Sequence, residues 1–333
     1  MSEQVTQPIL TTLNVGTPSV NVIGTGGAGI NLVRLVLPHL NEKATSRYID
    51  TSSSNNRPGE KVILINGDGS GSLRSENSDI IARKVTTYSG EDLNLADINI
   101  VVFSLSGGSG SVCGPLLIRD IVRRGKLAVA VVVISSEAER KVTNSINTIK
   151  SLENITSTSN IYLPIMFFDN KFGQEVVDKS LSDKLERLVD ILTLPAAELD
   201  RNDRLNWINA PKVIGATSGL RLLHVECGGS TGVAASEYWP GIDDDYIVDS
   251  VLNIRTQSER LPSPTSRASY TGIFTTVKIA PSIGIIGNKP DAFKPLTADL
   301  AHQQARYTSQ SGNKSAVISV AQEEVDQSTG LVL

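Results

Sequence analysis

Short apolar runs alternate with segments of helical periodicity along the first half of the chain. The runs have the length of strands buried on both faces of a sheet, and they occupy residues 20–23, 62–65, 98–105, 127–134 and 161–168. Apolar side chains at helical spacing separate several of them, at residues 30–40, 112–124 and 142–153. This alternation predicts an α/β fold with a doubly wound parallel sheet.

A long amphipathic segment ends the regular pattern. Val177, Leu181, Leu185, Leu188 and Leu192 repeat at helical spacing, and Pro195 follows them, so we expect one long helix over residues 172–192. The chain beyond it is less regular. We expect strands at 220–227, 272–280 and 315–321, helices at 243–253 and 291–307, and an exposed loop at 258–269.

These segments predict a division of the chain into parts. A length of 333 residues is typical of two domains. The expected parts are an N-terminal arm at residues 1–19, an α/β domain at 20–171, a central helix at 172–194, a smaller C-terminal α+β domain at 195–309, and a final strand with a tail at 310–333.

Composition excludes several classes of protein. Lys and Arg number 31 against 35 Asp and Glu, and this net charge of −4 argues against direct nucleic-acid binding, which normally needs a basic face. Cys113 and Cys227 are too few for a disulfide framework or a Cys-rich zinc site. No apolar run reaches the roughly 18–20 residues of a membrane span, so we expect a cytoplasmic protein without membrane contact.

A first glycine-rich loop follows the first expected strand and opens a helix. Its sequence is Gly24-Thr25-Gly26-Gly27-Ala28-Gly29, which lets backbone N–H groups approach phosphate oxygens at a helix N-terminus. Asp50 follows Gly29 by 21 residues, near the spacing of a ribose-binding acid. The loop therefore fits an NAD(P)-dependent Rossmann oxidoreductase, or a tight strand–helix crossing without a ligand.

A second glycine-rich loop is not required by a dinucleotide-binding fold. Residues 106–111 read SGGSGS after the strand expected at 98–105, and their serines add hydroxyl donors to the backbone groups. A third segment, residues 66–72, follows the strand at 62–65 and could close over a terminal phosphate. Because no G-x-x-x-x-G-K-[ST] pattern occurs, these loops predict a polyphosphate site unlike the common P-loop.

The order of these motifs resembles the tubulin/FtsZ superfamily of GTPases. GGAGIN in the first loop, SGGSGSV in the second, and LDRND after the long helical segment occur in the family's order. The serine form of the second loop, and LDRND running into Asn206 and Trp207, are similar to the tubulins of large bacteriophages, the PhuZ/TubZ group. The resemblance covers residues 20–207. It implies a tubulin-like fold with an N-terminal Rossmann-like GTPase domain.

The resemblance also implies residue roles. The α- and β-phosphates would contact the first two loops, Gly67, Gly69 and Ser70 would sense the γ-phosphate, Glu137 would bind the ribose, and Asn170 would read guanine. Asp178 would take the second guanine-reading position, although an acid there also suits the first turns of a helix. The nucleotide contacts expected in full are Gly26, Gly27, Ala28, Asn31, Asp50, Gly67, Gly69, Ser70, Gly107, Gly108, Ser109, Gly110, Ser111, Glu137, Lys141, Asn170 and Asp178.

Asp200 and Asp203 are the catalytic residues that the resemblance implies. In the family such acids reach the GTP of the next subunit, polarise the attacking water and help to hold Mg²⁺. Their spacing at a helix start puts both carboxylates on one face, but it is equally typical of an N-cap with an acid in the first turn. A head-to-tail contact of this kind builds an open filament of the chain with itself. The implied role is a phage cytoskeletal filament that positions or segregates phage DNA in the host cytoplasm.

Two alternatives remain beside the oxidoreductase. One is a protein that polymerises on GTP but hardly hydrolyses it. The other is a serine hydrolase, because residues 228–232 read GGSTG and Asp249 and His302 follow in the order of a catalytic triad.

Overall fold

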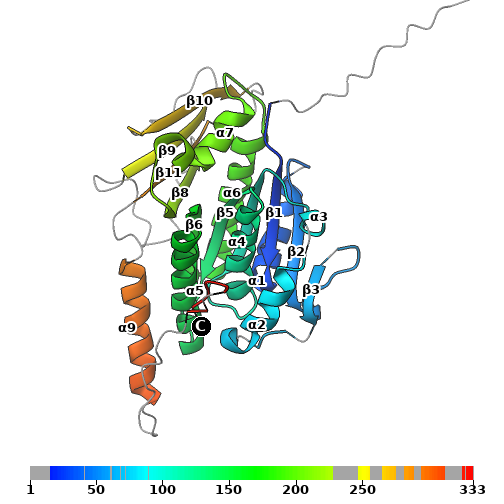
Figure 1. The fold of residues 1–333 in the computed structure, drawn as a ribbon, viewed down its shortest axis with the longest axis vertical. Helices are drawn as coiled ribbons and strands as arrows, with labels where there is room; N and C mark the ends of the chain where they lie inside the picture. The colour runs from blue at the N-terminus through cyan, green and yellow to red at the C-terminus, as the bar shows by residue number, and fades with distance from the viewer. Residues whose placement is uncertain are drawn as a thin grey trace, which may run out of the picture.

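The computed structural model describes residues 16–40, 42–60, 62–67, 69–71, 73–88, 90–227, 247–255, 265–274, 281–288, 294–311, 325–326 and 328–332. Within these residues one sheet of eleven strands has the order β3-β2-β1-β4-β5-β6-β8-β11-β9-β10-β7 (Figure 1). The strands are β1 (Val20–Thr25), β2 (Thr45–Ser52), β3 (Val62–Gly67), β4 (Ile98–Ser104), β5 (Leu127–Ile134), β6 (Tyr162–Asp169), β7 (Ala196–Ala197), β8 (Gly219–Cys227), β9 (Ile247–Arg255), β10 (Ala268–Phe274) and β11 (Ser282–Asn288).

Helices connect most of the strands. They are α1 (Gly26–Leu40), α2 (Arg74–Val85), α3 (Gly90–Leu93), α4 (Gly110–Arg123), α5 (Glu139–Thr158), α6 (Gln174–Thr193), α7 (Arg201–Ile208), α8 (Ala210–Ile214) and α9 (Lys294–Ser311), with short 3-10 turns η1 (Ser53–Asn55) and η2 (Asn170–Phe172).

Strands β1 to β6 are all parallel, and β8 continues them by pairing in parallel with β6. Beyond β8 the sheet is mixed, because β11 runs antiparallel to both β8 and β9. The carboxyl ends of the parallel strands therefore meet at one edge, which is where open α/β sheets bind their ligands. One continuous sheet runs through both expected domains, whose boundaries stay a prediction.

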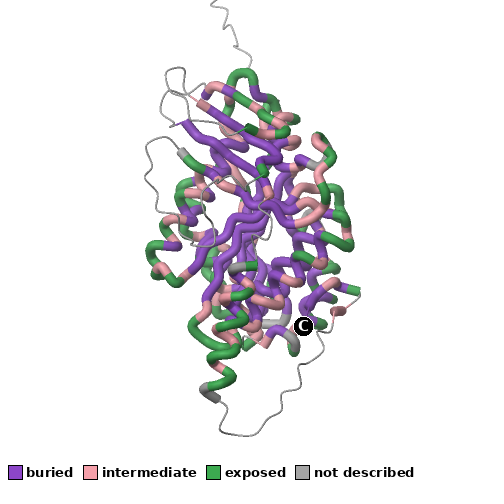
Figure 2. Tube along the Cα trace, turned by 90° about the vertical axis from the view of Figure 1, so that its left-hand side faces the viewer, coloured by how far each residue is buried: buried purple, intermediate pink, exposed green. Residues whose placement is uncertain are grey.

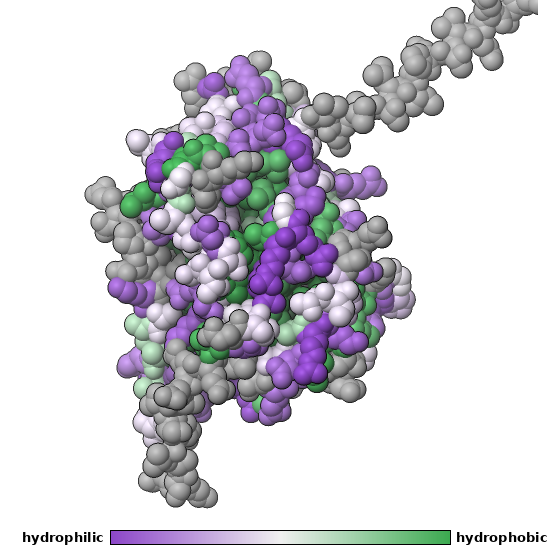
Figure 3. Space-filling model, in the orientation of Figure 1, coloured by the Kyte–Doolittle hydropathy of each residue, from purple (hydrophilic) through white to green (hydrophobic). Residues whose placement is uncertain are grey.

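Two hydrophobic clusters fill the two faces of the sheet. One collects buried residues of α2, α4, α5 and α9, and the other those of α1, α6 and α7. Figure 2 shows the buried strands at the centre and the exposed residues on the outward sides of the helices. On the face drawn in Figure 3, hydrophobic and hydrophilic surface alternate in small areas. None of the described helices has the length and apolar character needed to span a bilayer.

The sequence pattern predicted most of the parallel part of the sheet and the long helix after it. All five apolar runs are strands, and the long amphipathic segment is the single helix α6. The strand at 220–227 and the helix at 291–307 are also confirmed, as β8 and α9. The strand expected at 272–280 begins earlier, at Ala268, so it includes the end of the expected loop. Residues 258–264 of that loop, residues 275–280 and the strand at 315–321 lie outside the described residues, as does most of the N-terminal arm.

The helix expected at 243–253 is wrong where the structure describes it. Residues 247–255 form β9, which lies between β11 and β10 with almost every residue buried. Ile247, Val251 and Ile254 do repeat at helical spacing, but a strand covered on both faces also buries apolar residues at every position. The β-branched side chains of this segment favour the strand.

Candidate functional site

Three loops meet in one cavity at the carboxyl edge of the parallel strands. The cavity has a volume of about 330 Å³. It is lined by Thr25, Gly26, Gly27, Ala28, Asp50, Ser52, Asn55, Gly69, Ser70, Gly71, Ser104, Gly107, Gly108, Ser109 and Gly110. Residues of the first, second and third loops expected from the sequence therefore line one cavity.

Glycines bring the first two loops into direct contact. Gly26 has a φ of +68°, and a Cβ there would lie 2.7 Å from the backbone nitrogen of Gly110. A Cβ at Gly29 would lie 2.1 Å from the carbonyl oxygen of Val102, so α1 can pack this closely on β4 only with glycine at that position. These approaches set the N-termini of α1 and α4 side by side at the cavity.

The charge of the cavity comes from the backbone. Among its described lining residues there is no lysine or arginine, and Asp50 is the charged one. The helices α1 and α4 begin at Gly26 and Gly110, so their unpaired N–H groups and the positive ends of their dipoles face the cavity. An anion is thus attracted by oriented peptide groups, which suits phosphate.

The third loop is tied to its neighbours. Ser109 donates from its Oγ to Ser70 Oγ at 3.1 Å, and the backbone nitrogen of Gly69 donates to the carbonyl oxygen of Thr51 at 2.8 Å. Asp50 is buried beside them, with its carboxylate oxygens accepting from the Thr51 nitrogen at 2.7 Å and the Asn55 side chain at 2.5 Å. Both oxygens of Asp50 therefore have partners within the chain.

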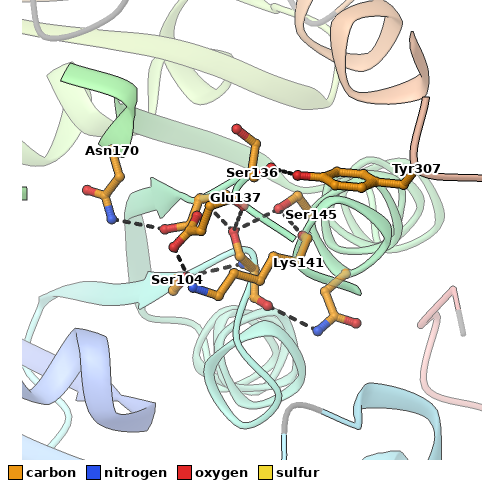
Figure 4. A network of polar contacts seen from close by, with 10 residues as sticks. Ser104, Ser136, Glu137, Lys141, Ser145, Asn170 and Tyr307 are labelled. Atoms are coloured by element: carbon orange, nitrogen blue, oxygen red, sulfur yellow. Dashed lines mark hydrogen bonds and ion pairs between the residues drawn. The ribbon is translucent and has the colours of Figure 1, made fainter. Parts of the chain in front are cut away.

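A row of hydroxyl groups leads from the cavity to Asn170. The backbone nitrogen of Ser106 donates to Ser104 Oγ at 3.1 Å, and that of Ser135 donates to Ser106 Oγ at 2.7 Å. Asn170 then donates from Nδ2 to Ser135 Oγ at 3.0 Å (Figure 4). Asp169 caps the turn that carries Asn170. The Oδ1 atom of Asn170 is buried and has no partner among the described residues, so it can accept from a ligand.

Glu137 and Lys141 lie in the same network (Figure 4) but outside the cavity lining. They form an ion pair of 2.5 Å at the start of α5. Partial burial raises the pKa of Glu137, but the hydrogen bond and charge of Lys141 outweigh this effect and lower the pKa overall. The Glu137 side chain is 62% exposed, which leaves it accessible to a ligand.

Some expected contacts lie elsewhere. Asn31 is exposed on α1, where its Oδ1 accepts from Arg34 at 3.3 Å, and Ser111 is fully buried, with its hydroxyl donating to the Gly108 carbonyl at 3.3 Å. Gly67 pairs with Ser52 at the end of β3. Asp178 is half-buried on α6, and burial raises its pKa although a hydrogen bond with Gln174 partly opposes this. None of these four residues lines the described cavity.

The structure also adds residues that the sequence patterns missed. Ser52 and Asn55 line the cavity from the end of β2 and the turn after it. The sequence analysis did not predict these two residues because it did not predict β2. That strand reads TSRYIDTS, which has too few apolar residues to indicate a strand. Asp50 and Thr51 are buried at the end of this strand that reaches the cavity.

Asp200 and Asp203 lie near the amino ends of the parallel strands, opposite the cavity. Asp200 caps α7 by accepting from the Asp203 nitrogen at 2.9 Å, and Asp203 accepts from the Asp200 nitrogen at 3.0 Å, which is a reciprocal capping box. Next to them Arg201 pairs with Asp97 at 2.7 Å, just before the first residue of β4. The cavity lies instead after the last residues of β1 and β4. Within one chain the acids and the cavity therefore lie at opposite ends of the parallel strands, separated by the length of a strand.

Comparisons with known proteins identify the class. Residues 19–177 match the GTPase domain of the Tubulin/FtsZ family. The chain is similar in sequence to phage tubulin-like proteins. It is 32% identical over 171 residues to a phage tubulin-like protein of Pseudomonas phage PhiPA3, and 27% identical over 205 residues to one of Pseudomonas phage phiKZ. These matches span 54% and 62% of the relatives' own length.

Solved structures extend the likeness to the whole fold. A protofilament of TubZ from bacteriophage PhiKZ has a TM-score of 0.76 at 23% identity, covering 94% of this chain and 99% of that one. A structure of the phage tubulin PhuZ with GDP has a TM-score of 0.75 at the same identity and coverage. The chain therefore has a tubulin-like fold.

Two alternative interpretations lose support. Asp249, which a hydrolase triad would pair with a histidine, is buried in an ion pair with Arg221 at 3.0 Å, and the GGSTG segment lies outside the described residues. The interpretation as an oxidoreductase gives a role to Asp50 but none to the second loop or to Asn170. Among the described residues no group of three or more His, Cys, Asp or Glu side chains could hold a metal ion by itself.

Proposed function

We propose that this chain is a GTPase that assembles head to tail into filaments, with GTP bound between consecutive subunits. The observation that carries the proposal is the position of the two halves of the site. A glycine-rich cavity suited to phosphate lies at the carboxyl ends of the parallel strands, and two acids, Asp200 exposed and Asp203 partly exposed, lie at the opposite ends. Translation of one subunit along the strand direction brings the acids of one copy to the cavity of the next, and repetition gives an open filament.

The cavity residues would divide the nucleotide among them. Backbone N–H groups of the first two loops would bind the α- and β-phosphates, and Gly69 and Ser70 would contact the γ-phosphate. Asn170 would accept from the N1–H or the amino group of guanine through its unpartnered Oδ1. Glu137 would accept from a ribose hydroxyl. Because adenine presents no hydrogen at N1, an Asn170 oxygen that accepts from N1–H would favour guanine as the base.

Asp200 and Asp203 would act on the nucleotide of the adjacent subunit. Each uses one carboxylate oxygen in the capping box, which fixes its orientation and leaves the other oxygen to orient a water molecule. Carboxylates also suit Mg²⁺, which would neutralise charge on the phosphates when bound. The chain's own contribution is to hold both acids rigidly at the helix start, so that hydrolysis requires a subunit contact.

The biological role that we propose is a cytoskeletal filament in an infected bacterium, in the host cytoplasm, that positions or segregates phage DNA without contacting it. Its support is the similarity to phage tubulin-like proteins and the acidic balance of the chain. A polymer that binds GTP without appreciable hydrolysis is the second candidate.

GTP turnover with Mg²⁺, measured across a wide range of protein concentration, tests the proposal. A threshold concentration followed by a steep rise in turnover per molecule is expected, because the complete site forms only between subunits. Constant turnover per molecule down to high dilution would contradict a site shared between subunits. Filaments with no turnover would support the second candidate.

A further inference from the structure

The end of the chain is docked on the same domain as the cavity. Residues 325–326 and 328–332, here called the C-terminal clasp, form a small hairpin in which Val325 and Val332 make an antiparallel bridge. Leu331 is fully buried and Val332 is 3% exposed, and Leu331 joins the hydrophobic cluster of α2, α4 and α5. Figure 1 shows the end of the chain, drawn in red, beside α4 and α5.

Side chains of the two helices hold the clasp through its backbone. Arg119 of α4 donates to the carbonyl oxygen of Ser328 at 3.1 Å, and Asn154 of α5 donates to that of Gly330 at 2.9 Å. Ser151 accepts from the Val332 nitrogen at 2.9 Å. These contacts use main-chain groups of the clasp, so they depend on its conformation.

Arg74 binds the clasp from a third direction. It is 3% exposed, and its Nε and Nη2 donate to the Val332 carbonyl oxygen at 3.2 Å and 3.1 Å. Nη2 also donates to Ser151 Oγ at 2.7 Å, and Nη1 donates to Thr148 Oγ1 at 3.2 Å. Burial lowers the pKa of Arg74 to about 9, which leaves it charged at neutral pH. A buried guanidinium is costly unless its donors are satisfied, so removing the clasp takes partners from it.

The same residue is joined to two loops of the cavity. Nη1 of Arg74 donates to the carbonyl oxygen of Ser111, the last residue of the second loop, which lies in the first turn of α4. Arg74 is also the first residue of α2, and it follows the third loop, whose Ser70 carbonyl accepts from the Leu73 nitrogen at 2.8 Å. The guanidinium of Arg74 thus connects the chain terminus with the second loop, and the backbone before Arg74 continues from the third loop.

We propose that Arg74 is a positioning residue that couples docking of the C-terminal clasp to the arrangement of the second and third loops. The proposal rests on the proposed nucleotide site for its ligand. A docked clasp holds Arg74 against Ser111 and fixes the start of α2, which favours the loop arrangement that binds nucleotide. By linkage, bound nucleotide strengthens docking of the clasp by the same factor.

The test compares affinities for a fluorescent GDP analogue at concentrations too low for assembly. The variants are a chain lacking residues 325–333, Arg74→Gln, their combination, and Gly330→Val. Gly330 has a φ of +75°, and a Cβ there would lie 3.2 Å from Ile155, so the valine should displace the clasp without touching Arg74. Arg124→Gln is the matched control, because Arg124 pairs with Asp120 near the end of α4, away from the clasp.

The expected result is a loss of affinity of about 5- to 30-fold for each clasp variant and for Arg74→Gln, the range of ordinary coupling between sites. The combined variant should lose no more than either change alone, since both break one connection. The control should bind as the unmodified chain does. Equal affinity with and without the clasp, or losses that multiply in the combined variant, would overturn the proposal.

Amide hydrogen exchange without nucleotide separates this proposal from the proposed function. Deleting the clasp should speed exchange in residues 74–85 and 110–115 by about tenfold, while the strands β4 and β5 stay protected. If the intact chain failed to bind the GDP analogue, the proposed function would be wrong, yet this exchange result would still decide the coupling. Unchanged exchange in both segments would contradict it.

Discussion

Gly110 shows at the level of one residue how the cavity depends on backbone packing. A Cβ at this position would lie 2.9 Å from the carbonyl oxygen of Thr25 and 3.5 Å from Phe103. The first of these neighbours is backbone and cannot rotate away. The amide groups of Gly110 and Gly26 face the same cavity, in which no lysine or arginine is available among the described lining residues to bind an anion. A displacement of either loop therefore changes the direction of the N–H groups that would bind it.

Gly110→Ala is therefore expected to weaken binding of GDP about tenfold or more, since forcing a methyl group into a packed site typically costs about 1–3 kcal/mol. Equilibrium binding of a fluorescent GDP analogue measures this, with circular dichroism to establish that the variant folds. Gly16→Ala is the control, because no atom lies within 4 Å of a Cβ there. Unaltered affinity in folded Gly110→Ala would remove the second loop from the site.

Asn170 determines base selection if its free Oδ1 accepts from guanine. Asn170→Leu should reduce the preference for GTP over ATP by about 10- to 100-fold, because the guanine donors would then be buried without an acceptor. Competition of each nucleotide against the fluorescent analogue measures the preference. Asn31→Ala, on the exposed face of α1, should leave it unchanged. Equal losses for GTP and ATP in Asn170→Leu would assign the residue a structural role.

These residues also show what a sequence reveals about a site. Glycines stand out because few other reasons place so many of them between a strand and a helix. Ser52 and Asn55 are ordinary polar residues, and their approach to the cavity depends on β2 pairing with β1 through contacts distant in sequence. Asn31 lies in the motif that carries the resemblance, yet its place on α1 turns its side chain to the surface in this structure.

Strand β9 makes the same point at the level of the element. Its sequence satisfies both a helical and a buried-strand pattern, and the strand is favoured because β10 and β11 pair with its two edges. Strands β1 and β4 to β6 needed no such information, because their apolar runs are bounded by turns and alternate with clear helices. Local pattern therefore predicts the parallel half of the sheet better than the mixed half.

The segment between α6 and α7 is held by one side chain. Arg204 is fully buried in the first turns of α7 and donates to the carbonyl oxygens of Ile191 at 3.1 Å, Leu194 at 2.7 Å and Gly16 at 3.0 Å. Two of these acceptors belong to the C-terminal end of α6, where helix carbonyls lack partners within the helix. Arg204 thereby fixes the acidic segment that carries Asp200 and Asp203 relative to the long helix.

Arg204→Met should lower the free energy of unfolding by about 3 kcal/mol, because it leaves buried carbonyl groups without donors. Chemical denaturation measures this change. Turnover should fall while nucleotide affinity below the assembly threshold stays the same, since the cavity lies at the other end of the sheet. Arg201→Gln removes a half-exposed ion pair with Asp97 and should cost less than about 1 kcal/mol. Similar stability losses in both variants would contradict this account of Arg204.

At the scale of the whole molecule, the long helix and the parallel strands separate the two halves of the proposed site. The 20 residues of α6 span about 30 Å, which is much longer than any side chain can bridge. A substitution can therefore disable the cavity or the acids of a chain while leaving the other half of the proposed site intact. In a filament, a junction is complete when the cavity of one subunit and the acids of its neighbour are both functional.

Mixing two defective variants tests this arrangement. Asp203→Asn keeps an acceptor for the capping box but loses the negative charge, and Gly110→Val keeps the acids but obstructs the cavity. Each alone should show almost no GTP turnover. An equal mixture should recover it, because roughly a quarter of randomly formed junctions then join an intact cavity to intact acids. Turnover is measured as phosphate release, and sedimentation of both variants together establishes that they share filaments. Mixed filaments that release no phosphate would contradict a site divided between subunits, whereas recovery would exclude a complete site within one chain.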